Sequence, residues 1–190
     1  MAERSGMLSM LQHVHPGGYF QRIDRAAREA VILQAATSVR QIVVIARTDA
    51  TARDIGERLA LSGMPTIVGQ PDDRGDAVRS FESDGVSTLV ASHDYLTANG
   101  PIEAPLVIHA RMATTSRQYT RRLNSTRAPL HLTFVVPEDE RAAETLVVQL
   151  SDDAVVSLDG DVDLTEVLDE HQHGEPATVA GQRRRFPLVR

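Results

Sequence analysis

The chain has 190 residues, and its composition excludes several classes of function. It contains no cysteine, which rules out disulfides, thiolate catalysis and cysteine-ligated zinc or iron–sulfur sites. All 20 basic residues are arginine, so a phosphate-binding loop of the G-x-x-x-x-G-K-[ST] type and lysine Schiff-base chemistry are excluded as well. Hydrophobic residues make up 42% of the chain, which is enough to bury a sizeable core.

The net charge of −6 hides a strong asymmetry along the chain. Residues 1–136 carry 15 arginines against 13 acids, a net charge of +2. Residues 137–175 carry 13 acids against one arginine (−12), and residues 176–190 carry four arginines and no acid (+4). No apolar run approaches the roughly 20 residues of a membrane helix, and residues 1–10 lack the pattern of a signal peptide. We therefore expect a cytoplasmic protein that does not associate with membranes.

The N-terminal part of the chain begins without a clear pattern. Residues 1–18 include the breaker Pro16-Gly17-Gly18, and we predict a flexible segment there. From Tyr19 to Arg40, apolar residues recur three and four positions apart. This spacing predicts a helix over residues 19–40.

Five short apolar runs predict the strands of a core, at residues 42–46, 65–68, 86–92, 106–110 and 130–136. The run at 86–92 is almost continuously apolar, which is typical of a strand buried on both faces at the centre of a parallel sheet. Helical spacing separates most of these runs, whereas residues 92–104 have the composition of a polar loop. The pattern predicts a doubly wound α/β domain with a mostly parallel sheet in three layers, α/β/α.

Beyond residue 136 the chain becomes acidic. Pro137, followed by three acids, predicts a helix from residue 137 to about residue 150. A further strand is expected at residues 155–158 and a short acidic helix at 161–170. We accordingly divide the chain into four parts: a flexible N-terminal segment (1–18), an α/β domain (19–150), an acidic extension (151–174) and a basic, disordered tail (175–190).

Four segments, taken in order, resemble a known family. Residues 42–61 form an apolar strand ending in Thr and a helix, and Arg74–Phe81 fits R-x-x-x-[apolar]-x-x-F. Residues 89–92 fit a strand ending in Ser or Thr, and residues 119–126 stand where the family has Y-x-H-R-x-G-R-[ST]. Over roughly residues 20–150 the chain resembles the C-terminal RecA-like domain of superfamily 2 helicases of the DEAD-box type. The resemblance implies a RecA-like fold.

Departures from this family argue against ATP chemistry. Where the family carries R-G-x-D, this chain reads Asn99-Gly100-Pro101-Ile102-Glu103, with no arginine before the glycine. In the last motif, Ser125 and Ala128 occupy the positions of the family's arginine fingers, which stabilise the transferred phosphoryl charge. The sequence also lacks the preceding RecA-like domain with its nucleotide loop. We expect no ATPase activity from this chain alone, no catalytic residue and no cofactor.

The resemblance leaves contact with nucleic acid as the expected function. The family grips phosphates with residues at the carboxyl ends of strands, where open α/β sheets place their ligands. Four positions match such residues, and five arginines follow within 17 residues that contain no acid. Arginine forks are well suited to phosphate. The candidate nucleic-acid-binding residues are Arg47, Thr48, Ser92, Gly100, Arg111, Arg117, Arg121, Arg122 and Arg127.

Other interpretations of the arginines stay open. They either cover a solvated helix or contact the acidic C-terminal segment, and the domain then acts as a protein–protein adaptor. In a third interpretation Arg121, Arg122 or Arg127 completes an ATPase site of another subunit. A Rossmann-like binder of small molecules is a fourth, but the chain has no G-x-G-x-x-G turn. The expected partners are thus RNA or single-stranded DNA, or a protein in a nucleoprotein complex.

Smaller signals are weaker still. The histidine pairs His13-x-His15 and His171-x-His173 lack a third ligand, so no metal site is expected. Ser92-His93-Asp94 contains the residue types of a hydrolase, but the members of a catalytic triad are brought together by the fold rather than placed side by side. The acidic residues 152–170 form either a solvated face or a mask over the arginines.

Overall fold

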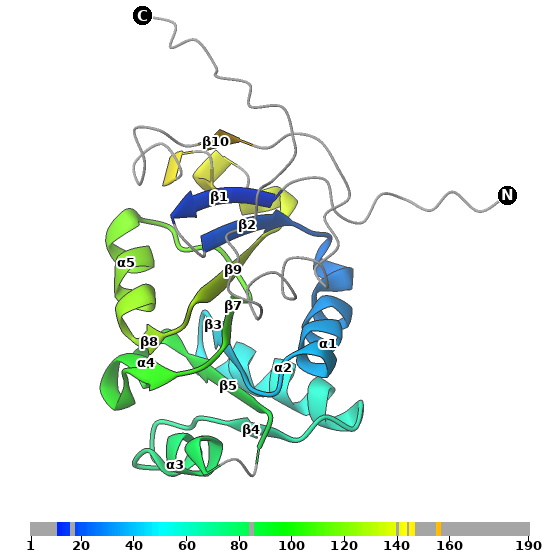
Figure 1. The fold of residues 1–190 in the computed structure, drawn as a ribbon, viewed down its shortest axis with the longest axis vertical. Coiled ribbons are helices and arrows are strands. Elements are labelled where there is room, and N and C mark those ends of the chain that lie inside the picture. Colours follow the sequence, from blue (N-terminus) through cyan, green and yellow to red (C-terminus); the bar gives the residue numbers. More distant parts are fainter. Residues whose placement is uncertain are drawn as a thin grey trace, which may run out of the picture.

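The structure is a computed structural model and describes residues 11–15, 18–83, 86–139, 141–143, 145–146 and 155–156. Figure 1 shows a twisted sheet that runs through the whole domain, with helices on both of its faces.

Within the described residues, eight strands form one sheet in the order β10-β1-β2-β9-β7-β3-β5-β4. The strands from β2 to β4 in this order run parallel, whereas β1 and β10 pair with their neighbours antiparallel. The mostly parallel sheet is therefore confirmed. The strands are β1 (Leu11–His15), β2 (Gly18–Arg22), β3 (Ile42–Ala46), β4 (Thr66–Val68), β5 (Thr88–Ser92), β7 (Leu106–His109), β9 (Leu130–Val135) and β10 (Val155–Val156).

Helices cover both faces of the sheet, which confirms the three-layer α/β class. The first two helices pack on one face and the next three on the other (Figure 1). The helices are α1 (Arg28–Ser38), α2 (Asp49–Leu61), α3 (Asp76–Glu82), α4 (His93–Asn99) and α5 (Ser116–Asn124), with 3-10 turns η1 (Arg25–Ala27) and η2 (Pro137–Asp139).

The core lies along the central strands. Every residue of β3 and β5 is buried, because helices cover both sides of this part of the sheet. Val44 and Val90 point toward α1 and α2, whereas Val43 and Leu89 point toward α3 and α4. The prediction of a doubly buried central strand at residues 86–92 is confirmed.

The predicted helix at residues 19–40 is wrong over its first part. Residues 19–22 belong to β2, which pairs in parallel with β9, and the helical backbone begins only at η1 and α1. Phe20 is buried against Tyr119 rather than on a helix face. Aromatic residues suit strands, and pairing with β9 outweighs the local helical spacing. Residues 11–15 form β1, so the boundary drawn at residue 19 falls inside a β-hairpin.

The segment 92–104, predicted to be a loop, contains α4 and strand β6 (Ile102–Glu103). Strand β6 pairs with β8 (Thr126–Arg127) in a separate two-stranded sheet. After β9, residues 137–139 form η2, and residues 141–143 and 145–146 are helical. The remainder of that predicted helix, most of the acidic extension and the basic tail lie outside the described residues. No helix in the described part of the chain has the length and apolar character needed to cross a membrane.

Candidate nucleic-acid interface

The carboxyl ends of β3, β5 and β7 meet at one edge of the sheet. Ala46 pairs with Ser92, and Ile45 pairs with His109, so these strands end level with one another. Arg47 follows β3, and His93 follows β5. The sequence thus places several polar side chains at the edge where open α/β sheets bind ligands.

Two of the candidate residues cap helices that begin at this edge. The Thr48 hydroxyl accepts a hydrogen bond from the Thr51 N–H at 3.2 Å and caps α2. The Ser92 hydroxyl accepts one from the Tyr95 N–H at 3.2 Å and caps α4. Thr48 is exposed, whereas Ser92 is buried. Both hydroxyls therefore stabilise local structure, and Ser92 does so instead of forming a triad.

Arg122 is the most unusual side chain at this edge. It is only 1% exposed, and its Nη1 donates to the Arg111 carbonyl oxygen at 2.7 Å. The side chain thus reaches back toward the start of α5, as long side chains in helices do. Its Nε is buried without a hydrogen-bond partner. Burial, and then the charge of Arg47, lower the pKa of Arg122 to about 10, so the guanidinium stays charged at neutral pH.

His93, the first residue of α4, lies near the same guanidinium. It is 9% exposed, and its Nδ1 is buried without a partner. Burial lowers the pKa of His93, and the charges of Arg122 and Arg121 lower it further, while Asp94 acts in the opposite direction. The charges of Arg47 and Arg121 act on Arg122 and His93, respectively, and we call Arg47, His93, Arg121 and Arg122 the edge cluster.

Helix α5 carries further positive charge on its exposed side. Arg117 and Arg121 are both exposed and stand four residues apart, a spacing at which like charges repel on a helix. The helix contains no acid. In the part of the chain that the structure describes, neither residue forms an ion pair with a carboxylate.

Two other candidate arginines are neutralised within the domain. Arg111 donates to both carboxylate oxygens of Asp139, at 2.9 and 3.2 Å, and this hydrogen-bonded contact raises its pKa. Arg127 pairs with Glu103 at 3.3 Å on the surface. Asp139 belongs to the acidic part of the sequence that begins after residue 136. The expected contact between the arginines and that part is thus observed for Arg111.

Gly100 lies away from the edge cluster, beyond the C-terminal end of α4. Its N–H donates to the Leu96 carbonyl oxygen at 2.7 Å. A Cβ on Gly100 would come within 2.5 Å of the Ser125 carbonyl oxygen, so a glycine is required by this close backbone approach. That carbonyl accepts the Ile102 N–H at 3.2 Å, and the buried Ser125 hydroxyl donates to the Arg122 carbonyl at 2.8 Å. The Ser125 position is therefore closed by internal hydrogen bonds.

The fold thus divides the candidate residues between two places. The charge of Arg47 acts on Arg122, next to Arg121 in the last turn of α5, whereas Gly100 follows α4 and Arg127 belongs to β8, which pairs with β6. His93 was not among the predicted binding residues. His93 directly follows the predicted central strand, just as Arg47 directly follows β3. This position in the sequence could have identified it.

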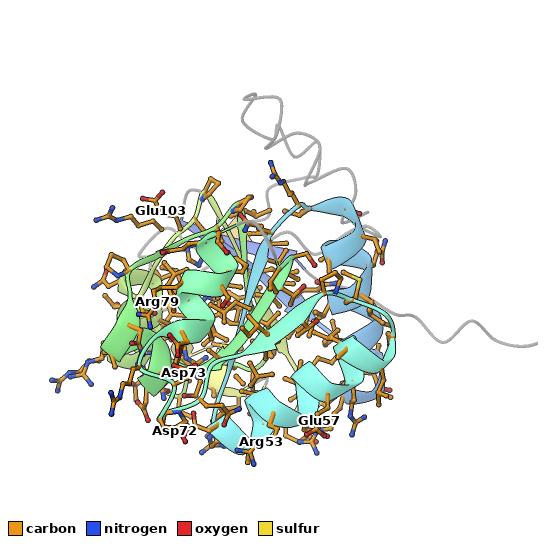
Figure 2. The ribbon with its side chains drawn as sticks, turned by 90° about the horizontal axis from the view of Figure 1, so that it is seen from below. Arg53, Glu57, Asp72, Asp73, Arg79 and Glu103 are labelled. Carbon is orange, nitrogen blue, oxygen red and sulfur yellow. The ribbon has the colours of Figure 1, made fainter. Side chains whose placement is uncertain are left out.

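The face formed by α2, the loop after β4 and α3 has a different character. Figure 2 shows acidic and basic side chains interspersed there, among them Arg53, Glu57, Asp72 and Arg79. No group of three or more potential metal ligands occurs among the described residues. The unpaired positive charge therefore distinguishes the carboxyl edge from this face.

Comparison with known proteins identifies the fold. No model of a known protein family matches the sequence, and no curated protein matches it. Among solved structures, the DEAD-box protein SrmB of E. coli, bound to regulator of ribonuclease activity A, is similar with a TM-score of 0.62 and 16% identity, covering 73% of this chain and 87% of that one. The C-terminal domain of the DEAD-box protein Dbp5 gives a TM-score of 0.60 at 14% identity, covering 79% and 92%.

A DEAD-box protein from Methanococcus jannaschii is similar with a TM-score of 0.61 at 12% identity. The match covers 72% of this chain but only 40% of that longer chain. The domain accordingly has the RecA-like fold of the C-terminal half of DEAD-box helicases, as the sequence motifs predicted.

Proposed function

We propose that this chain is a non-catalytic accessory module that binds the phosphates of RNA or single-stranded DNA at the edge cluster. The observation that carries the proposal is the buried guanidinium of Arg122, which has no counter-ion among the described residues. A buried charge without a partner is strongly destabilising. An anion bound by the exposed arginines of the edge cluster, Arg47 and Arg121, would supply the missing negative charge.

The surroundings of Arg122 favour a polyanion over a single small ion. Arg47 and Arg121 are exposed beside it, and Arg117 continues the positive charge one turn along α5. Repelling charges at Arg117 and Arg121 weaken the helix slightly, which a phosphate backbone would reverse. Arginine is the residue that best matches phosphate geometry. The helicase-like fold favours nucleic acid as the source of those phosphates.

We infer that the chain does not hydrolyse ATP on its own. Ser125 stands at one arginine-finger position and uses its hydroxyl and its carbonyl within the domain. Ala128, at the other, packs against the core beneath α3 and α4. Of the arginines that could complete an ATPase site in another subunit, Arg127 already pairs with Glu103 and Arg122 is buried, which leaves Arg121.

A salt titration of binding to a fluorescent single-stranded RNA tests the proposal. We expect the logarithm of the association constant to fall linearly with the logarithm of the salt concentration, with a slope of about −0.7 for each phosphate contacted. The double variant Arg47→Ala and Arg121→Ala should reduce that slope by about two such contacts. Arg58→Ala is the matched control, because Arg58 is an exposed arginine in the last turn of α2, at the other end of that helix from the edge.

Absence of salt-dependent binding in the wild-type protein would contradict the proposal. The protein-adaptor interpretation would then take its place, supported by two observations. Arg111 and Arg127 are already paired with acids of this chain, and SrmB was solved in complex with a protein, the regulator of ribonuclease activity A.

A further inference from the structure

Arg111 leaves the sheet beside the edge cluster. In the ladder between β3 and β7, Ile45 pairs with His109, and the Ala110 N–H donates to the Ile45 carbonyl oxygen at 3.0 Å. Arg47 and Arg111 each stand two residues beyond this pair, so they leave neighbouring strands at the same level. Neighbouring strands lie about 4.8 Å apart. Arg111 thus continues the positive charge of the edge cluster onto the next strand.

A hydrogen bond connects Arg111 directly with the edge cluster. The Nη1 of Arg122 donates to the Arg111 carbonyl oxygen at 2.7 Å. The buried Arg122 thereby holds the backbone of residue 111 in place and does not itself need to touch a ligand. The side chain of Arg111, in contrast, is 32% exposed. A ligand at the carboxyl edge can therefore reach its guanidinium from solvent.

The guanidinium of Arg111 already holds an anion. Its Nε and Nη2 donate to the two carboxylate oxygens of Asp139, at 2.9 and 3.2 Å. Two parallel N–H···O bonds of this kind are also the way in which arginine binds two oxygens of a phosphate. The Asp139 carboxylate thus lies where a phosphate would have to bind to use this arginine.

Asp139 reaches Arg111 from the first residues of the acidic part of the sequence. Strand β9 pairs in parallel with β7, so η2, which follows β9, lies at the edge where Arg111 follows β7. Beyond η2, Ala143 and Leu146 are buried against the core. Their burial keeps this segment on the domain. Asp139 can therefore release Arg111 by turning its side chain, without detachment of the segment.

We propose that Asp139 is an autoinhibitory phosphate mimic, whose carboxylate occupies the Arg111 guanidinium until a nucleic-acid phosphate displaces it. The inference rests on the proposed function and adds the regulation of the same site. In the free protein, Asp139 neutralises Arg111 and places a negative charge at the binding edge. In the complex, Arg111 contacts a phosphate next to those held by Arg47 and Arg121. Nucleic acid thus binds more weakly than it would at this edge without Asp139.

The variant Asp139→Asn tests the proposal. The amide keeps the size of the side chain and removes its charge, so a phosphate no longer competes with a carboxylate. We expect the fluorescent single-stranded RNA to bind about tenfold more tightly, the effect of one charge-assisted contact. Urea denaturation of each variant establishes that the protein compared is folded.

Two further variants show whether the gain passes through Arg111. Glu138→Gln is the matched control, because it removes the same charge one residue away, where Glu138 faces Arg25 at 3.9 Å and both are more than half exposed. It should change the affinity by less than about twofold, as expected for an exposed, screened charge. Adding Arg111→Met to Asp139→Asn should abolish the tenfold gain.

Nuclear magnetic resonance observes the displacement in the wild-type protein. The Nε–H signal of Arg111, assigned by its loss in Arg111→Met, should shift when RNA is added, because its acceptor changes from carboxylate to phosphate. A signal that stays unchanged in saturating RNA would overturn the inference.

The outcomes separate this inference from the proposed function. Equal, salt-dependent binding of RNA by the wild type and by Asp139→Asn would overturn the inference and leave the proposed function standing. A gain that survives Arg111→Met, or one that Glu138→Gln reproduces in full, would overturn it as well. Absence of salt-dependent binding in both the wild type and Asp139→Asn would remove both proposals together.

Discussion

Two groups of residues near the C-terminal end of helix α5 differ in how completely their polar atoms are paired. In the first group, the Ser125 hydroxyl, the Ser125 carbonyl and the Gly100 N–H each have a hydrogen-bond partner within the domain. In the second group, the buried Arg122 and His93 each leave a nitrogen without one. Native proteins rarely leave such groups unpaired without a reason. Complete internal pairing thus indicates a structural role for the first group. The two unpaired nitrogens of the second group belong to a wider set of buried polar atoms without a partner, which also includes atoms of Arg28, Thr88 and Thr133.

The comparison also separates two kinds of motif match. Gly100 stands where helicases carry the glycine of R-G-x-D, but internal packing fully explains a glycine there. Arg122 stands where they carry an arginine, and no internal contact balances its charge. Substitutions at Gly100 and at Arg122 should consequently change stability and binding in different proportions.

The largest effect on stability is expected for Gly100→Ala. The new Cβ would meet the Ser125 and Leu96 carbonyl oxygens at 2.5 and 2.7 Å, so the backbone must shift. We expect a loss of about 3 kcal/mol in the free energy of unfolding, measured by urea denaturation, with unchanged RNA affinity of the folded fraction.

Gly63→Ala is the matched control for that substitution. Gly63 has a φ of 85°, and no atom lies within 4 Å of a Cβ built there. Gly63→Ala should lower the free energy of unfolding by about 1 kcal/mol, because alanine is strained at this positive φ. Equal losses at the two glycines would mean that the close approach at Gly100 is not what fixes this end of α5.

A smaller effect of the opposite sign is expected for Arg122→Met. Methionine keeps most of the apolar volume and removes a buried charge that no carboxylate balances. We expect the free energy of unfolding to rise by about 1 kcal/mol, while RNA binding weakens. The contrasting variant is Arg111→Met, which removes a partner of the largely buried Asp139 and should destabilise by about 1 kcal/mol. Strong destabilisation by Arg122→Met would show that Arg122 serves structure rather than a ligand.

The smallest effect is expected for Arg127→Ala. Arg127 and Glu103 are 68% and 76% exposed at the side chain, so solvent screens their attraction. The variant should lose less than about 0.5 kcal/mol, and a double-mutant cycle with Glu103→Ala at low and high salt measures the pair directly. A coupling energy well above that value would place this exposed pair among the structural contacts of the β6–β8 sheet.

Much of the fold was predictable because its strands are locally distinct. The run Ile42–Ala46 is the strand β3 to the residue, and the run at 130–136 differs from β9 by one residue. Continuous apolar runs of this length have few alternatives in a chain whose other segments show helical spacing. The same reasoning located α2, α3 and α5.

The missed elements lack such local signals. Helix α4 is seven residues long, and only Tyr95 and Leu96 bury apolar side chains, too few for a repeating pattern. Strand β2 depends on β9, which lies far away in the sequence. Both errors thus arise where tertiary packing decides the structure and periodicity contains little information.

The candidate site was predictable only in outline. The sequence shows five arginines but does not state which are paired, buried or free. One clue was available: Arg122 stands three residues after Tyr119, and residues at that spacing share a helix face. A buried tyrosine at position 119 therefore implies a buried arginine at 122. Arg111 and Arg127 are paired with carboxylates that lie more than 20 residues away in the sequence, so the sequence alone does not reveal these ion pairs.

The pairing of β2 with β9 has a consequence for how the chain reaches its fold. Residues 18–22 pair with residues 131–135, so the first and the last parallel strands along the chain are neighbours in the sheet. During synthesis β2 emerges early and has no neighbour on this side until β9 follows. Contacts so distant along the chain slow folding, and an unpaired strand exposes hydrogen-bonding groups to other chains. Docking of the N-terminal hairpin is therefore expected to be the late, rate-limiting and aggregation-sensitive step of folding.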